Sequence, residues 1–356
     1  MEKISTTKVG PSGREIGRAE WFWVSLSSEA ERRNFSRYAI FIALQMVVGV
    51  IKSCAPLRMT DGYSAARLPK IPAAAPSCRP NLAPMLSEAS AATAPLGTLV
   101  VLGGGDDDPL LALLASLLPD RTAPIEVFTT ATRRQPARTA AAYAHAWHQL
   151  GCPHVRHLQV NEDHPADDPA TLVRLRRAAL VFMSGGDQER ITDFLLGSEF
   201  LAILRHKYQH EAGFILAGTS AGASALAEVM LVDGHGWRSL LGGRIEVKPG
   251  LNLLPGVLLD QHFTERGRYP RLMHAVLAQP ALLGIGLSEE TGLVIRPGQP
   301  VQVFGEEAVV VVDAAHASHN NLPGLADDAV ISGHGLRLHL LVAGQQLDLA
   351  TREVRQ

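Results

Sequence analysis

The strongest constraint on the fold is a regular alternation of short apolar segments and longer helical patterns between Gly97 and Gly218. The apolar segments are TLVVLGGG, IEVFTTAT, HVRHLQV, ALVFMSGG and GFILAG. The helical patterns between them include Pro109–Leu118, Ala137–Leu150, Asp168–Ala178 and Ser198–Ala212. Short apolar strands that alternate with helices are typical of a parallel sheet covered on both faces. The alternation therefore predicts a doubly wound α/β domain with a mostly parallel sheet.

The pattern changes to β after Gly256, where apolar segments follow one another from GVLLDQHF to LRLHLLV. One helical pattern, from about Tyr269 to Leu277, interrupts them. We expect a β-rich C-terminal extension that makes the sheet mixed.

Residues 1–95 differ from the rest and predict a poorly ordered extension before a folded domain at 96–356. Ala39–Ile51 is an apolar run, but a membrane helix needs about 20 such residues, so we expect no stable membrane span. The run has the length of a signal-peptide core, although a long segment precedes it. We expect a cytoplasmic protein, with export as the alternative. The Ala- and Pro-rich stretch Leu68–Pro95 predicts a linker.

Composition argues against several classes of partner. The formal net charge of −2 gives no reason to expect a nucleic acid. The three cysteines, Cys54, Cys78 and Cys152, are too few and too scattered for a disulfide framework or a zinc site.

The stretch Gly218 to Gly222 reads G-x-S-x-G and lies between a predicted strand and a run of small residues that predicts a helix. A serine at such a sharp turn exposes its hydroxyl above the sheet, and the flanking glycines avoid clashes with strand and helix. Ser220 is therefore the candidate nucleophile. The same pattern also arises by chance in chains rich in glycine and alanine, where it marks only a tight turn. Ligands of doubly wound sheets bind at this carboxyl end of the strands.

A nucleophilic serine needs a base, and His262 has the best context among the histidines. It ends the apolar segment GVLLDQHF beside Asp260 and Gln261, which could not be buried without partners. Three arginines follow: Arg266, Arg268 and Arg271. The alternative is a basic turn that binds a phosphate or carboxylate without catalysis.

The segment LLGIGLSEETGLVI offers Glu289 and Glu290 between two apolar strands. Such an acid either orients the histidine or is only a charge in a turn. The sequence context of these residues favours a triad in the order Ser220, His262, Glu289. In an α/β-hydrolase the order is serine, acid, histidine, with the histidine last in the chain. That scaffold would need His334 or His339.

Four stretches carry a resemblance to a known family: MSGGDQ, GTSAGASALAEVM, GLNLLPGVLLDQHFTERGRYPRL and LLGIGLSEETGLVI. In this order they closely resemble the cyanophycinases, serine peptidases related to the α-aspartyl dipeptidases. The resemblance runs from about Gly97 to about Asp313. It implies a flavodoxin-like α/β fold, of the kind shared with class I glutamine amidotransferases, and a homodimer.

The resemblance also implies a Ser-His-Glu triad. Ser220 would be the nucleophile, His262 the general base and acid, and Glu289 the group that holds the imidazole. The backbone N–H groups of Ala221 and Gly186 would form the oxyanion hole. No metal or organic cofactor is implied.

The implied substrate is cyanophycin, a poly-aspartate with arginine joined to each side-chain carboxyl, which is cleaved to β-Asp-Arg dipeptides. The alternatives are a peptidase for short aspartyl or isoaspartyl peptides and a non-catalytic binding protein. The implied substrate-binding residues are Gln188, Asp260, Gln261, Arg266, Arg268 and Arg271. Arginines suit the free carboxylate of a β-aspartyl unit, and Asp260 or Glu265 would take the substrate guanidinium. The sequence departs from the family at Ser288, where many members have aspartate, and at Gly292, where alanine is common.

Overall fold

The computed structural model describes residues 3–9, 15–22 and 94–356, and the chain divides into the units Met1–Met85 and Leu86–Gln356. In the first unit, strands β1 (Lys3–Val9) and β2 (Glu15–Phe22) form an antiparallel hairpin. The apolar run Ala39–Ile51, Cys54, Cys78 and nearly all of the predicted linker lie outside the described residues. Within the described ranges, no helix has the length and apolarity to cross a membrane. The predictions about order, export and the start of the folded domain therefore stay predictions.

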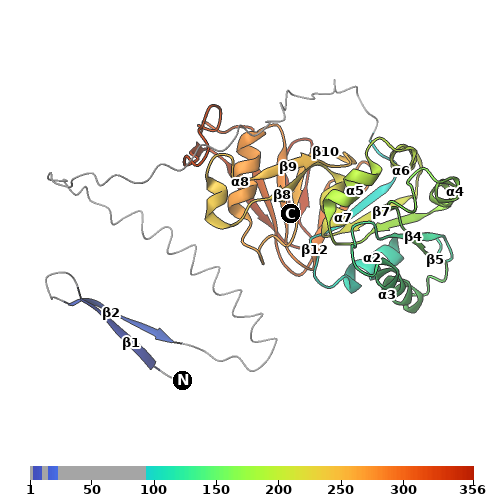
Figure 1. The fold of residues 1–356 in the computed structure, drawn as a ribbon, viewed down its shortest axis with the longest axis horizontal. Coiled ribbons are helices and arrows are strands. Elements are labelled where there is room, and N and C mark those ends of the chain that lie inside the picture. Colours follow the sequence, from blue (N-terminus) through green and yellow to red (C-terminus); the bar gives the residue numbers. More distant parts are fainter. Residues whose placement is uncertain (1–2, 10–14, 23–93) are drawn as a thin grey trace. The chain divides into compact units, whose positions relative to one another are not determined.

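The second unit contains a nine-stranded sheet whose centre is parallel (Figure 1). The parallel strands, in spatial order, are β3 (Thr98–Leu102), β7 (Ile215–Thr219), β6 (Leu180–Met183), β4 (Ile125–Phe128) and β5 (Val155–Leu158). On the other side of β3 the sheet continues with antiparallel strands β12 (Thr291–Ile295), β13 (Val301–Gly305), β18 (Gln346–Leu347) and β19 (Val354–Arg355). The predicted α/β class is confirmed.

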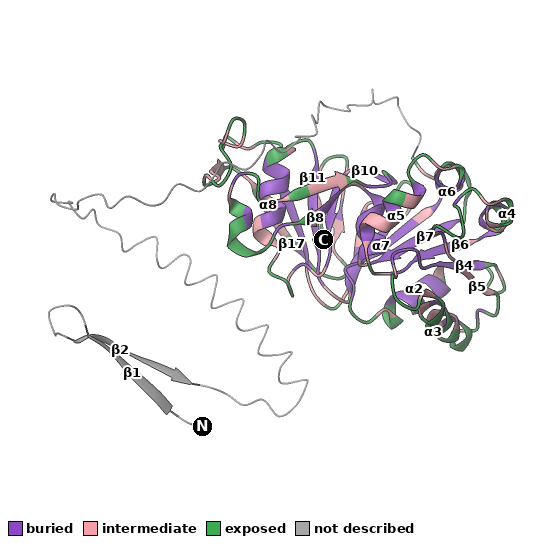
Figure 2. Ribbon diagram, in the orientation of Figure 1, coloured by how far each residue is buried: buried purple, intermediate pink, exposed green. Residues whose placement is uncertain are grey.

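Helices cover both faces of this sheet, and β3 shows why. Val100 and Leu102 point into a core formed with α2 (Asp108–Leu117) and α3 (Pro136–Gln149). Leu99 and Val101 point into the opposite core, because successive side chains of a strand face opposite ways. That core is covered by α4 (Pro169–Arg177), α5 (Gln188–Leu195), α6 (Glu199–His210) and the short α7 (Ala221–Leu226). Figure 2 shows the central strands buried between these layers.

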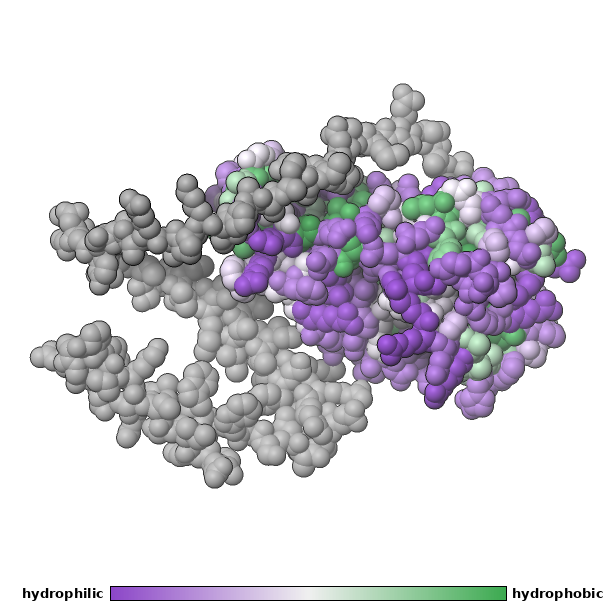
Figure 3. All heavy atoms as spheres, viewed as in Figure 1, coloured by the Kyte–Doolittle hydropathy of each residue, from purple (hydrophilic) through white to green (hydrophobic). Residues whose placement is uncertain are grey.

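A second, six-stranded sheet follows in the chain. Its strands, in spatial order, are β17 (Arg337–Leu341), β14 (Val309–Asp313), β11 (Leu283–Leu287), β10 (Leu254–Asp260), β8 (Ala227–Asp233) and β9 (Glu246–Pro249). One face shares the core under α5 and α7, and the other packs against α8 (Tyr269–Ala278). A 3-10 turn, η1 (Gly236–Leu240), contacts α8, and β15 (His319–Asn320) pairs with β16 (Gly333–His334). Hydrophilic residues cover most of the visible face of the second unit (Figure 3).

The β-rich part differs from the expectation in two ways. It begins at Ala227 rather than after Gly256, because α7 ends after six residues. Most of it forms a separate sheet, and only β12, β13, β18 and β19 extend the first one. Alternating apolarity identifies a strand, but which neighbour the strand pairs with is decided by the layers that bury its two faces. The predicted helix at about Tyr269–Leu277 is confirmed as α8.

A buried ion pair fastens α4 to the first sheet. Glu126 on β4 is only 1% exposed. Arg174 on α4 donates from Nε to Glu126 Oε1 at 3.2 Å, and its second nitrogen pairs with Oε2. The same guanidinium donates to the His157 carbonyl on β5 at 2.6 Å. Arg174 thus supplies the positive charge and the hydrogen bonds that offset the burial of the Glu126 carboxylate.

We expect Arg174→Met to lower the free energy of unfolding by about 3 kcal/mol, because it leaves a buried carboxylate without its partner. The matched control is Arg176→Met on the same helix. Arg176 pairs with Glu199 where both side chains are about half exposed, so we expect a loss below about 1 kcal/mol. Urea unfolding followed by circular dichroism measures both. If both variants lose the same free energy of unfolding, the buried Glu126–Arg174 pair stabilises the fold no more than the exposed pair does.

Candidate active site

Ser220 lies at the predicted turn between β7 and α7, in a rarely adopted backbone conformation with φ 52° and ψ −114°. The chain turns so sharply that its flanking glycines have no room for a side chain. A Cβ on Gly218 would lie 2.6 Å from the backbone carbon of Gly222, and one on Gly222 would lie 2.8 Å from that of Met183. The G-x-S-x-G pattern is therefore a steric requirement of this turn.

The side chains of Ser220, His262 and Glu289 form a continuous hydrogen-bonded series. Ser220 Oγ lies 2.8 Å from His262 Nε2, and His262 Nδ1 lies 2.6 Å from Glu289 Oε1. A carboxylate at Nδ1 accepts a hydrogen bond from Nδ1–H, which leaves Nε2 unprotonated and able to accept one from the serine hydroxyl. Glu289, which the resemblance implied as the acid of the triad, is the glutamate that contacts the histidine. This arrangement can activate a serine hydroxyl.

Ser220, His262 and Glu289 lie in three separate segments of the chain. Three consecutive backbone carbonyl oxygens at the end of β3 bind these segments. Each accepts one N–H from a segment that carries one of these side chains. The pairs are Leu102 with Ser220 at 3.0 Å, Gly103 with His262 at 2.9 Å, and Gly104 with Glu290 at 2.7 Å. The glycine-rich loop after the first strand thus aligns residues that come from β7, β10 and the β11–β12 connection.

The same loop packs directly against the histidine ring. Gly104 has φ 107°, a conformation that glycine adopts readily. A Cβ at this position would lie 2.7 Å from His262 Nε2. Any side chain at Gly104 would therefore displace the ring from Ser220.

The predicted oxyanion hole lies next to Ser220. Ala221 begins α7, so its N–H has no acceptor within the helix. The Gly185 carbonyl faces Thr132, which donates to it at 3.1 Å. Since C=O and N–H point opposite ways in a trans peptide, the Gly186 N–H points away from Thr132. A Cβ built on Gly185 would lie 3.6 Å from Ser220 Oγ, which places this loop beside the nucleophile. The contribution of these N–H groups to an oxyanion hole stays a prediction.

The carboxylate of Asp260, two residues before His262, is bonded to two of the predicted substrate-binding arginines, Arg268 and Arg271. Asp260 is 1% exposed and Arg271 is 2% exposed. Arg271 donates from Nε to Asp260 Oδ2 at 2.7 Å, and Arg268 donates to Asp260 Oδ1 at 3.2 Å. Burial lowers the pKa of Arg268 to about 10, so its guanidinium stays protonated near neutral pH. Asp260 is thus occupied by two guanidinium groups of the chain, which argues against its binding a substrate guanidinium directly.

The three predicted arginines border one small cavity of about 80 Å³. Arg266 is exposed, and Glu265 beside it accepts a hydrogen bond from Thr264. Gln188 is buried and donates to the Leu231 carbonyl at 2.8 Å. Gln261 is also buried, and its Oε1 has no hydrogen-bond partner within the described residues. The structure therefore brings the arginines together, whereas Gln188 already bonds to the backbone.

Sequence reasoning missed three polar residues. Ser239 lines the arginine cavity, and its buried Oγ has no partner in the described part of the chain. Asp107 accepts a hydrogen bond from Thr219, the residue before Ser220, at 2.6 Å. Ser288 joins the segments of the histidine and the glutamate by accepting from Thr264 at 2.9 Å and donating to the Ala308 carbonyl. Two of them had a signal in the sequence: Asp107 lies in the acidic run after the first strand, and Ser288 was noted only as a departure from the family.

We expect Gly104→Ala to slow the labelling of Ser220 by a fluorophosphonate probe about 100-fold, because the added methyl displaces the ring of His262. The control is Gly298→Ala, which also has positive φ but an empty Cβ position. It should leave the labelling rate unchanged. Mass spectrometry of the labelled protein measures both rates. Unchanged labelling of a folded Gly104→Ala protein would show that the loop does not position the histidine.

Comparison with known proteins identifies the family of the chain. Residues 99–303 match the sequence model of peptidase family S51. The cyanophycinase of Synechococcus elongatus is 33% identical over 263 residues, which cover 73% of this chain and 81% of that protein. The cyanophycinase of Trichormus variabilis is 31% identical over 260 residues, or 72% and 87% of the two chains. The crystal structure of a peptidase from an acI-B1 actinobacterium has a TM-score of 0.51 and 25% identity, with 70% of this chain and 96% of that chain covered. The chain therefore belongs to peptidase family S51 and is a serine-type peptidase.

Proposed function

We propose that this protein is an exopeptidase that hydrolyses cyanophycin to β-Asp-Arg dipeptides through a Ser220–His262–Glu289 triad. The observation that carries the proposal is the unbroken series of hydrogen bonds from Ser220 Oγ through the imidazole to the Glu289 carboxylate. The names of the relatives, which are cyanophycinases, support the choice of substrate. The predicted homodimer and cytoplasmic location are part of the same proposal.

The geometry supports a two-step acyl transfer. His262 Nε2 takes the hydroxyl proton as Ser220 Oγ attacks the scissile carbonyl carbon, and Glu289 stabilises the resulting imidazolium. The backbone N–H groups of Ala221 and Gly186 would stabilise the negative oxygen of the tetrahedral intermediate. The imidazolium then gives its proton to the leaving amine, and the acyl-enzyme forms. Water repeats the sequence and releases the carboxylic acid product.

The arginine cavity supports a substrate with a free carboxylate beside the scissile bond. Asp260 neutralises only one of its two arginine partners, so the cluster with Arg266 keeps a positive charge that favours an anion. In this proposal Asp260 is a positioning residue for Arg268 and Arg271. The unpartnered oxygens of Ser239 and Gln261 are acceptors that a substrate N–H group could satisfy.

A second candidate is a peptidase for short aspartyl or isoaspartyl peptides. The observation in its favour is the small volume of the arginine cavity, about 80 Å³, which suits one acidic residue. This candidate uses the same triad and differs only in the length of the substrate. Product analysis therefore separates it from the first proposal.

The test uses the full chain with insoluble cyanophycin, clearing of the suspension, and mass spectrometry of the products. We expect the unaltered protein to release β-Asp-Arg, and Ser220→Ala and His262→Ala to lower the rate by about 10³-fold or more. Glu289→Gln should also lower it strongly, because the amide no longer favours the reactive tautomer.

The controls are His334→Ala and His339→Ala, which would be inactive in an α/β-hydrolase arrangement. We expect both to keep full activity, since His262 contacts the nucleophile. No clearing, together with cleavage of short aspartyl peptides, would favour the second candidate. If neither substrate is cleaved although Ser220 reacts with a fluorophosphonate, both candidates fail.

A further inference from the structure

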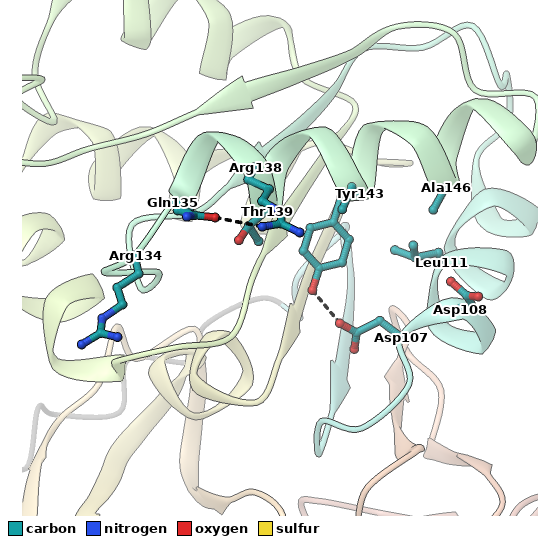
Figure 4. A pocket seen from close by; sticks show the side chains of 10 residues that line it. Asp107, Asp108, Leu111, Arg134, Gln135, Arg138, Thr139, Tyr143 and Ala146 are labelled. Carbon is teal, nitrogen blue, oxygen red and sulfur yellow. Dashed lines mark hydrogen bonds between the residues drawn. The ribbon is translucent and has the colours of Figure 1, made fainter.

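A pocket of about 440 Å³ lies between the start of α2 and one side of α3 (Figure 4). It does not include the triad residues or the arginine cavity, and none of the substrate-binding residues predicted from the sequence lines it. We call it the α2–α3 pocket. Its volume falls within the range of sites that hold small organic ligands.

The inner wall of the α2–α3 pocket is connected to the nucleophile. Asp107 Oδ2 accepts a hydrogen bond from the Tyr143 hydroxyl at 2.6 Å, and Asp107 Oδ1 accepts one from Thr219 Oγ1 at 2.6 Å. Thr219 is the residue directly before Ser220. Burial raises the pKa of Asp107, although the two hydrogen bonds act in the opposite direction. A ligand in this pocket would therefore lie beside the strand that presents the serine.

The pocket carries charges of both signs. Figure 4 shows Arg134 at one end and Asp108 at the other, with Arg138 and Asp107 between them. The Arg134 guanidinium and the Asp108 carboxylate have no side-chain hydrogen bond or ion pair to any residue of the described part, and both residues are exposed. Among the described residues, the one hydrogen bond of the Arg138 guanidinium goes to the Gln135 amide oxygen, at 3.3 Å. The free charges complement a ligand that is itself positive at one end and negative at the other.

We propose that the α2–α3 pocket is a second substrate subsite, which takes an arginine-bearing unit of the substrate other than the unit in the arginine cavity. The guanidinium of that unit would pair with Asp108 and Asp107, and its free carboxylate would pair with Arg134 and Arg138. A carboxylate has about four acceptor positions, so Asp107 keeps capacity beyond its two present bonds. The inference rests on the proposed function, because cyanophycin carries one such zwitterionic arginine on every aspartate.

The test compares aspartate oligomers of two and four units, each unit carrying an isopeptide-linked arginine. We expect the full chain to show a lower KM for the four-unit oligomer. Arg134→Gln and Asp108→Asn should each raise that KM about tenfold, the loss of one charge-assisted contact, without changing kcat. Neither change should alter the KM for the two-unit oligomer. The matched control is Arg177→Gln, an exposed arginine at the end of α4, which should match the unaltered protein with both oligomers.

The outcomes separate the two proposals. If the unaltered protein cleaves both oligomers and the pocket variants match it, the subsite is wrong and the proposed function stands. If the variants lose activity equally with both oligomers, the pocket supports the active site rather than a distant unit, and the subsite is again wrong. If the unaltered protein cleaves neither oligomer, the proposed function fails and the subsite fails with it.

Discussion

The alignment of the site depends on three consecutive carbonyl oxygens at the end of β3. Leu102, Gly103 and Gly104 accept backbone N–H groups from the segments of the serine, the histidine and the glutamate. These segments belong to two different sheets, so side-chain contacts alone would have to hold them across a junction. Backbone hydrogen bonds to one short loop instead fix the positions of the three segments relative to one another. The close approach also explains the glycines, since a Cβ on Gly103 would lie 2.8 Å from the backbone carbon of Leu287.

The junction between the sheets also explains the order of the residues along the chain. The chain leaves the first sheet after β7, where Ser220 lies, and builds the second sheet with β8, β10 and β11. His262 follows β10, and Glu289 lies where the chain returns from β11 to β12 in the first sheet. All three side chains therefore meet at the edge where the two sheets face each other. An α/β-hydrolase completes its triad within one sheet and places its histidine last, which this topology does not do.

Two carboxylates near the nucleophile, those of Asp260 and Asp107, have different kinds of bonding partner. Asp260 is bonded to the guanidinium groups of both Arg268 and Arg271, so this cluster keeps an excess positive charge. Asp107 instead accepts hydrogen bonds from two neutral hydroxyl groups, and it borders a pocket in which Arg134 and Asp108 have no ion-pair partner among the described residues. A paired buried ion is a structural element, whereas an ion without a partner at the surface of a pocket is available to a ligand. This contrast is the physical basis for assigning a positioning role to Asp260 and a ligand to the α2–α3 pocket.

Three features follow from the order of residues alone: the α/β class, the strand-to-helix turn at Ser220 and the candidate status of His262. Each of these depends on local information: periodicity of apolar residues, glycines at a sharp turn, and polar residues at the end of an apolar strand. Residue spacing alone left Glu289 and Glu290 open, because neighbouring residues in a turn differ in direction and not in spacing. The family resemblance implied Glu289, and the tertiary structure places its carboxylate against the imidazole. The tertiary structure alone showed that Asp260 is already paired with arginines of its own chain, that the C-terminal strands form a second sheet, and that Asp107 reaches Thr219. These facts depend on contacts between residues far apart in the chain, and such contacts arise only when the layers pack.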